Sequence, residues 1–203
     1  MKTILQLNAS MLSDNGQSSR LANEFVTALR QEEPAAKLIL RDLARDPVPH
    51  LDADRFGAFI ARPEARTLKQ DAFVAYSDGL IGELKQADVI VLGLPMYNFG
   101  VPSTLKAYFD HIARAGVTFQ YTAAGPVGLL TGKKAYVLAA RGGMYVGTPR
   151  DTQTAYVRDF FAFLGITDVE FVYAEGLAMG ESIKTESLAK ARESLHNLVP
   201  AFA

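Results

Sequence analysis

One stretch of the chain decides its fold: Asp88-Val89-Ile90-Val91-Leu92-Gly93-Leu94. After the first aspartate this run contains no polar side chain. A continuous apolar run of this length predicts a strand that is buried on both faces, because a half-exposed strand would alternate apolar and polar residues. Strands buried on both faces are typical of parallel sheets covered by helices.

Similar segments on either side of this run extend the pattern. Short apolar runs predict strands at Thr3–Leu7, Lys37–Leu43, Ala135–Ala140 and Val169–Tyr173. Residues of helical period separate these runs. They predict a first helix ending near Pro34 and two helices in Leu51–Ala87 divided near Pro63. Three later helices are marked by Leu105, Phe109 and Ile112, by Val157, Phe160, Phe161 and Leu164 before a stop at Gly165, and by Leu188, Ala191, Leu195 and Leu198. Alternating strands and helices predict an α/β fold.

The expected arrangement is a doubly wound five-stranded parallel sheet of order 2-1-3-4-5 with helices on both faces. In that arrangement the ligand crevice lies at the carboxyl ends of the strands, beside strands one and three. Function should therefore be sought in the loops after strands one, three and four.

Composition narrows the classes of function. The 203 residues show no break in composition, which favours a single domain spanning 1–203. The net charge of -1 gives no reason to expect nucleic acid or a membrane surface as partner. The chain has no cysteine, so thiol catalysis, disulfides and thiolate metal sites are excluded, and a cytoplasmic location is expected. No stretch approaches the ~20 apolar residues of a membrane span.

The loop after the first strand is rich in small polar residues. It reads Asn8-Ala9-Ser10, then residues 11–15, then Gly16-Gln17-Ser18-Ser19 at the start of the helix. Hydroxyls and backbone amides that converge at a helix N-terminus suit a phosphate group without any lysine. An ordinary helix cap by a serine remains the alternative.

The loop after the third strand is stiff and aromatic: Pro95-Met96-Tyr97-Asn98-Phe99-Gly100-Val101-Pro102. Prolines restrict the backbone at both ends, and the glycine allows close approach of a ligand. Two aromatic side chains and an amide at the mouth of a crevice suit a planar heteroaromatic ring. A hydrophobic plug over the sheet is the alternative, although Asn98 suits a plug poorly.

The loop after the fourth strand contains paired glycines: Arg141-Gly142-Gly143-Met144-Tyr145-Val146-Gly147. The glycines free backbone amides to face a ligand, and we expect Arg141 to add positive potential. A flexible glycine turn is the alternative for this loop alone. Three such loops at one predicted crevice indicate a ligand site.

These three segments resemble a known family. Ser10 with Gly16-Gln17-Ser18, Met96-Tyr97-Asn98-Phe99 and Ala140-Arg141-Gly142-Gly143 are similar to the FMN-contacting segments of bacterial FMN-dependent NADH:azoreductases, also described as quinone oxidoreductases. The resemblance runs nearly end to end and includes Ala113–Phe119 and Phe163–Val169. It implies a flavodoxin-like fold, bound FMN, NADH or NADPH as hydride donor, and a homodimer with active sites at the interface.

Two further implications concern single residues. Tyr121 and Phe163 match aromatic positions that line the substrate space over the flavin in this family, although either side chain could equally be a core aromatic. The family often has serine where this chain has Gly16 and Ala140. Each replacement removes a hydroxyl and leaves the backbone donors, so FMN affinity should be tuned rather than abolished.

The resemblance implies a ping-pong reaction in which the nicotinamide leaves before a quinone or azo acceptor binds, and an azo bond needs two rounds to give two amines. The cofactor carries the difficult chemistry, so no side chain is assigned as an obligatory acid or base. His50, His111 and His196 show no metal-ligand or triad spacing, and surface positions are expected for all three. The chain also lacks a Gly-x-Ser-x-Gly nucleophile elbow.

Two other classes of function stay open at this point. A flavodoxin-type electron carrier would bind FMN without turning over an organic substrate, but such carriers are usually strongly acidic. A flavin-free α/β binding domain would use the same crevice for another anion. The choice between NADH and NADPH is also open, since the arginine that would contact a 2′-phosphate could be Arg62, Arg66 or another one.

Overall fold

The computed structural model describes residues 1–202, and a five-stranded parallel sheet forms its centre, with strand order β2-β1-β3-β6-β7. The strands are β1 (Thr3–Asn8), β2 (Lys37–Asp42), β3 (Val89–Pro95), β6 (Lys134–Ala140) and β7 (Asp168–Ala174). Counted along this sheet alone, the order is 2-1-3-4-5, so the predicted doubly wound arrangement is confirmed.

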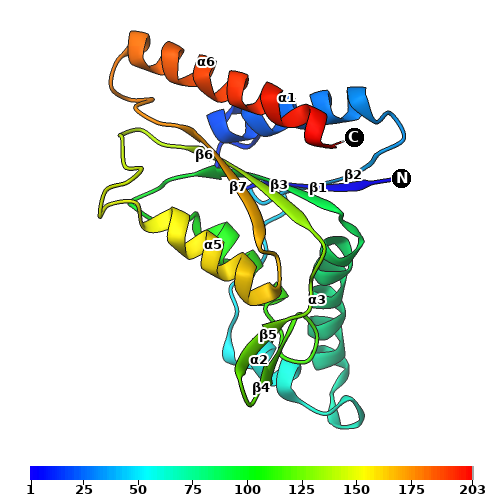
Figure 1. The fold of residues 1–203 in the computed structure, drawn as a ribbon. Helices are drawn as coiled ribbons and strands as arrows, with labels where there is room; N and C mark the ends of the chain where they lie inside the picture. The colour runs from blue at the N-terminus through cyan, green and yellow to red at the C-terminus, as the bar shows by residue number, and fades with distance from the viewer. Residues whose placement is uncertain (203) are drawn as a thin grey trace.

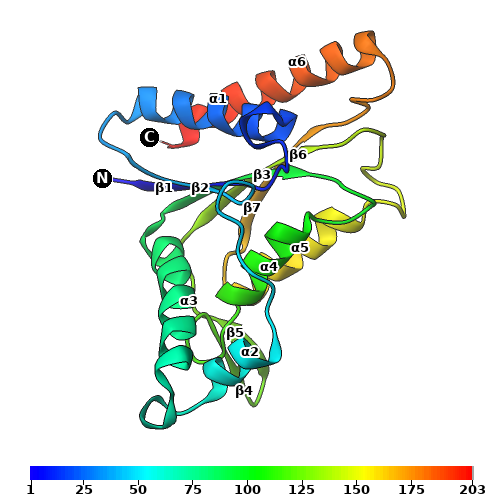
Figure 2. The same ribbon diagram turned by 180° about the vertical axis from the view of Figure 1, so that it is seen from behind.

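Helices cover both faces of the sheet (Figure 1 and, from behind, Figure 2). One face carries α1 (Gln17–Glu32) and α6 (Glu181–Leu198), and the other carries α3 (Leu68–Gln86), α4 (Ser103–Ile112) and α5 (Thr152–Leu164). The shorter helices are η1 (Ser13–Asn15), α2 (Ala53–Ile60), η2 (Pro63–Ala65) and η3 (Val199–Phe202). No helix in residues 1–202 has both the length and the apolar character needed to cross a membrane.

The central strand explains the apolar run that predicted the fold. Every residue of β3 is buried. Ile90 and Leu92 belong to the core cluster under α3, α4 and α5, whereas Val89 and Val91 belong to the cluster under α1 and α6. Because successive side chains of a strand point to opposite faces, burial on both faces requires apolar residues at consecutive positions.

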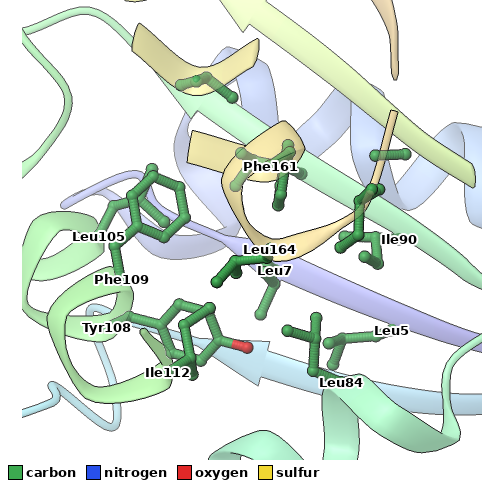
Figure 3. Close-up of a cluster of buried hydrophobic side chains, with 14 of the residues drawn as sticks. Leu5, Leu7, Leu84, Ile90, Leu105, Tyr108, Phe109, Ile112, Phe161 and Leu164 are labelled. Atoms are coloured by element: carbon green, nitrogen blue, oxygen red, sulfur yellow. The ribbon is translucent and has the colours of Figure 1, made fainter. Parts of the chain in front are cut away.

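The larger core cluster joins the sheet to α4 and α5 (Figure 3). Leu5, Leu7 and Ile90 of the sheet pack with Phe109 and other residues of α4 and with Phe161 of α5, and all five side chains are fully buried. Each buried side chain of this size stabilises the fold by about 1.5–3 kcal/mol relative to its exposed state. This cluster holds α4 and α5 against the sheet, and both helices begin beside the loop that follows β3.

Local signals set several of the helix ends, and the breaks at Pro63 and Gly165 lie where the sequence predicts them. Pro63 begins η2, which separates α2 from α3 as expected. Thr67 and Gln70 form a reciprocal capping box at the start of α3. Gly165 ends α5 in a left-handed conformation with φ of 99°, which glycine adopts without steric cost.

A β-hairpin between α4 and β6 is absent from the sequence prediction. Its strands are β4 (Phe119–Thr122) and β5 (Gly125–Gly128). Each strand is four residues long, and three of the four β4 residues are exposed. The hairpin therefore lacks the apolar run by which a strand is recognised in a sequence. Tertiary contacts hold it instead. The hydroxyl of Thr118 donates to the carbonyl of Ile112 at 2.6 Å and accepts from the amide of Arg114 at 3.0 Å.

One predicted surface position is wrong. His50 and His196 are exposed, but His111 is buried, with only 1% of its surface accessible. It lies on the inner face of α4, and its Nδ1 is 2.9 Å from the carbonyl oxygen of Ala107 one turn earlier. Because its own helix provides this hydrogen-bond acceptor, the ring can be buried as a neutral group.

Candidate cofactor site

The register of the sheet brings the three predicted loops to one edge. Asn8 pairs with Gly93, and Ala140 pairs with both Pro95 and Ala174. The loops then begin side by side: the first loop (Ala9–Gly16) after β1, the second loop (Met96–Val101) after β3 and the third loop (Arg141–Gly147) after β6. Backbone hydrogen bonds continue between them, since the amide of Met96 donates to the carbonyl of Ala140 at 3.1 Å.

The first loop leads into a helix N-terminus with free donors. Gly16 is the N-cap of α1 and provides no side-chain cap. In the described chain, the amides of Gln17, Ser18 and Ser19 have no acceptor. The hydroxyls of Ser18 and Ser19 are fully buried and also have no partner. Unpaired buried hydroxyls are costly, and together with the positive end of a helix they fit an anionic group such as a phosphate.

Gly16 makes room for Ser10 in this loop. Ser10 is 1% exposed, and its Oγ accepts a hydrogen bond from the amide of Leu12 at 3.2 Å. A Cβ at position 16 would lie 2.1 Å from the Oγ of Ser10 and 2.5 Å from its Cβ. The glycine that departs from the usual family sequence is therefore required by the position that Ser10 takes here.

The second loop contains a tight turn with an unusual backbone. Tyr97 and Gly100 exchange two backbone hydrogen bonds of 3.2 and 2.9 Å across the turn. Asn98 and Phe99 between them have φ of 49° and 62°. Positive φ at both central residues is the condition of a type I′ turn, and it is uncommon for a bulky residue such as phenylalanine. Both side chains are exposed at the edge of the sheet.

Side chains connect the second loop to its two neighbours. The hydroxyl of Tyr97 lies 3.3 Å from the Oγ of Ser10 and accepts from the amide of Met11 at 3.3 Å. On the other side, the ring of Phe99 meets the ring of Tyr145 edge to face, with centroids 5.6 Å apart. The three loops therefore form one continuous surface.

Arg141 has a different role from the one predicted. Its side chain is fully buried and donates to Asp151 at 2.8 Å and to Glu175 at 3.1 Å. Glu175 also accepts from the amides of Tyr145 and Val146 at 2.9 and 3.1 Å. The guanidinium charge is thus compensated inside the protein and is not available to the crevice, and Arg141 instead fixes the third loop.

Burial alone would raise the pKa of Asp151. The hydrogen bonds from Arg141 and Thr154 outweigh burial and lower the pKa, so the carboxylate stays ionised in this pair.

The paired glycines of the third loop keep their amides free. The carbonyls of Gly142 and Gly143 accept from Ala178 and Gly176 at 3.0 and 2.9 Å. Among residues 1–202, neither glycine amide has an acceptor. The loop therefore offers two backbone donors to a ligand, as its sequence predicts.

The structure thus brings most of the predicted site residues together. The following residues lie in the three loops, at the adjoining strand end or in the first turn of α1: Ser10, Gly16, Gln17, Ser18, Met96, Tyr97, Asn98, Phe99, Ala140, Arg141, Gly142 and Gly143. Ser19 joins them as a buried hydroxyl, and the run of small polar residues at the helix start was the signal for it.

Tyr121 and Phe163 lie elsewhere in the chain. Tyr121 belongs to the hairpin, and Phe163 lies in the last turn of α5. The ring of Phe119 joins them, with its centroid 5.5 Å from that of Tyr121 and 4.2 Å from that of Phe163. At 1.5 Å per residue, Phe163 is roughly 16 Å along the helix from Thr152, the α5 residue that contacts the second loop. Tyr121 is 74% exposed.

A cavity of about 480 Å³ adjoins the second loop. Phe99, Val101 and Tyr156 give it apolar walls, and His50 and Lys106 stand at its border. This volume is within the range of small-molecule sites, and the walls are of the kind that hold flat apolar molecules.

Arg62 and Arg66 lie in the connection between α2 and α3, at the far end of the molecule from the three loops (Figures 1 and 2).

Comparison with known proteins agrees with this geometry. Residues 2–199 match the family described by its flavodoxin-like fold, so fold and site define a flavodoxin-like protein. The chain is 54% identical over 201 residues to the FMN-dependent NADH:quinone oxidoreductase of Cellvibrio japonicus (strain Ueda107), covering 99% of this chain and 100% of that protein. A protein of the same name from Alcanivorax borkumensis is 56% identical over 192 residues, 95% of this chain and 97% of the relative.

Solved structures give the same result. An azoreductase from Bacillus anthracis str. Sterne superposes with a TM-score of 0.90 at 28% identity, over 98% of this chain and 99% of the other. An FMN-dependent NADH-azoreductase from Bacillus anthracis str. Ames Ancestor, in complex with FMN, gives a TM-score of 0.87 at 27% identity over 98% and 100%. The chain belongs to the flavodoxin-like family of FMN-dependent NADH:quinone oxidoreductases, and the resemblance noted in its sequence is confirmed.

Proposed function

We propose that this chain binds FMN on its three loops and passes hydride equivalents from NADH to quinone and azo acceptors by a ping-pong reaction. The observation that carries the proposal is the pair of buried serine hydroxyls, Ser18 and Ser19, without partners in residues 1–202 beside the free amides of α1. Such a group of neutral donors at a helix N-terminus suits the phosphate of FMN. The names of the relatives support both the cofactor and the hydride donor.

Each loop would contact a different part of the cofactor. The α1 N-terminus would hold the phosphate, and the second loop, from Met96 to Phe99, would border the ring. The free amides of Gly142 and Gly143 would donate to the edge of the ring where negative charge develops on reduction. Bound FMN supplies hydride acceptance and return, so the chain needs to bind and orient rather than to provide an acid or base.

The proposed acceptor site is the cavity beside Phe99. Its apolar walls and open shape suit flat aromatic molecules of different sizes. Nicotinamide and acceptor would use this space in turn, which requires the first to leave before the second binds. An azo compound would need two rounds for cleavage to amines. We also propose a cytoplasmic location, where NADH is available.

We further propose a homodimer in which each active site receives Tyr121 from the other subunit. Tyr121 and Phe163 match family positions that line the substrate space, yet α5 separates Phe163 from the second loop of its own chain by roughly 16 Å. Tyr121 is 74% exposed on a hairpin held rigidly at its base, as an aromatic side chain directed at a partner would be. A second copy is the simplest way to complete the site.

Purified protein titrated with FMN and then supplied with NADH and menadione tests the main proposal. Bound flavin, rapid NADH loss and parallel double-reciprocal lines at varied menadione are expected. Decolourisation of an azo dye tests the second acceptor class. Flavin binding without NADH loss would instead identify an electron carrier, and a protein that stays colourless with micromolar FMN would exclude both.

The shared site has its own test because the chain contains no cysteine. Tyr121→Cys combined with Phe99→Cys should give a disulfide-linked dimer on mild oxidation. The control pairs Phe99→Cys with Leu68→Cys, a residue 90% exposed on α3. Equal cross-linking of the two pairs, or a monomer by light scattering, would contradict the arrangement.

A further inference from the structure

Three consecutive residues at the start of α5 each contact the second or the third loop of the site. Asp151 caps the helix by accepting from the amide of Thr154 at 3.1 Å and pairs with Arg141 of the third loop. The hydroxyl of Thr152 donates to the carbonyl of Phe99 in the second loop. Gln153 contacts the backbone on both sides of the same turn. One helix end therefore contacts the second and third loops together.

Gln153 makes the most demanding of these contacts. Its side chain is fully buried, and its Nε2 donates to the carbonyls of Pro95 and Gly100 at 2.9 and 2.8 Å. Both partners are acceptors, so the orientation of the carboxamide is determined. The Oε1 atom has no partner within residues 1–202. An unpaired buried acceptor such as this Oε1 atom lowers stability, and the two hydrogen bonds that Nε2 donates to the loop offset that cost.

The turn that Gln153 holds needs external support. Phe99 has a φ of 62°, which is costly for a bulky side chain and persists only where surrounding contacts enforce it. Gln153 and Thr152 together bond one carbonyl before the turn, at Pro95, and two carbonyls within it, at Phe99 and Gly100. Because β3 ends at Pro95, Phe99 and Gly100 lie beyond that strand and depend on contacts from elsewhere.

We propose that Gln153 is a positioning residue for the cofactor: it fixes the second loop in the conformation that borders the flavin ring, while the Asp151–Arg141 pair fixes the third loop from the same helix end. Its part in cofactor binding rests on the proposed function. Its part in holding the loop does not, and separate measurements test the two parts.

The test replaces Gln153 by Met, which has a similar length and no donor, and by Glu, which has the same shape and cannot donate when ionised. In the FMN-free protein, hydrogen exchange at the amides of Met96 and Gly100 should accelerate at least about tenfold in both variants. The dissociation constant for FMN should rise about tenfold for the loss of two hydrogen bonds. The visible spectrum of the bound flavin should shift as well.

Val157→Ala is the matched control. Val157 is fully buried in the same helix, belongs to the core under α5 and contacts neither loop by a hydrogen bond. It should lower stability and leave both the FMN dissociation constant and the exchange of the second loop within about twofold of the parent. Parent-like exchange and FMN affinity in Gln153→Met, or the same losses in Val157→Ala, would overturn the proposal. If the parent protein binds no FMN, the proposed function fails, and the exchange data alone decide the role of Gln153 in the loop.

Discussion

Gly128 of the hairpin and Gly165 at the end of α5 pack backbone against backbone. A Cβ built on Gly128 would lie 2.0 Å from the amide nitrogen of Gly165 and 2.2 Å from the carbonyl carbon of Leu164. The amide of Leu130 donates to the carbonyl of Leu164 at 2.8 Å and continues the contact. Tyr121 lies on the hairpin and Phe163 on α5. The backbone contact therefore sets where these two aromatic side chains lie relative to each other.

Gly128→Ala should therefore separate the hairpin from α5. The added methyl group meets backbone atoms, which no side-chain rotation can relieve, so we expect a loss of about 2–4 kcal/mol in the free energy of unfolding. Urea denaturation followed by circular dichroism measures this loss.

Gly82→Ala, in α3, should have the opposite effect on stability. A Cβ at Gly82 would extend into open space, with no neighbouring atom of residues 1–202 within 4 Å, and Gly82 lies inside the helix. Alanine there should stabilise the protein by about 0.5–1 kcal/mol. Equal destabilisation by both alanines would show that Gly128 is not a special contact.

Ser18→Ala should have opposite effects on stability and on ligand binding. The hydroxyl of Ser18 is buried without a partner in the described residues, so its removal should leave the FMN-free protein unchanged or more stable by up to about 1 kcal/mol. The same change should raise the FMN dissociation constant about tenfold, as fluorescence titration would measure.

Ser77→Ala is the comparison for that result. Ser77 is equally buried, but its hydroxyl donates to the carbonyl of His111 at 2.6 Å and accepts from Arg114 at 3.1 Å. Its loss should cost about 1–3 kcal/mol of stability and leave FMN affinity unchanged. If Ser18→Ala behaves like Ser77→Ala, the phosphate site is misplaced.

Arg141→Met should be among the most destabilising single substitutions. It leaves the carboxylates of Asp151 and Glu175 largely buried without their cation, and breaking a buried pair in this way typically costs about 3–5 kcal/mol. Thermal and chemical unfolding measure the effect. Arg192→Ala breaks an exposed pair between α6 and Glu24 of α1, where we expect a loss of at most about 1 kcal/mol. Comparable losses in the two variants would contradict the role assigned to Arg141.

Stability should fall on mild acidification because of His111. Burial lowers the pKa of His111 below its ordinary value of 6.5, although the hydrogen bond to Ala107 opposes this. The unfolded chain then takes up a proton at a higher pH than the folded protein does. The contribution of His111 to the free energy of unfolding is therefore fully present above pH 6.5 and decreases as the pH falls below that value.

Urea unfolding between pH 5 and 8 measures this slope. His111→Gln should flatten it, whereas His196→Gln, at an exposed position on α6, should leave it as in the parent. A slope that is unchanged by His111→Gln would place the titrating group elsewhere.

The sequence by itself determined the sheet, its order and the edge where the cofactor loops meet. The apolar run of β3, the left-handed stop at Gly165 and the small polar residues before α1 are local signals. Each depends on periodicity or on the conformational preferences of a few neighbouring residues, which can be recognised without knowing the rest of the fold.

Only the tertiary structure decided which polar groups are paired inside the protein. Arg141 meets Glu175 across 34 residues of sequence, and Gln153 meets Pro95 across 58. A buried arginine and a free one look alike in sequence, as do a buried and an exposed histidine, and the short hairpin has no apolar run to reveal it. The hydrogen-bond partner of each of these side chains lies on an element that comes near only after folding. For that physical reason the contacts could not be predicted from the sequence.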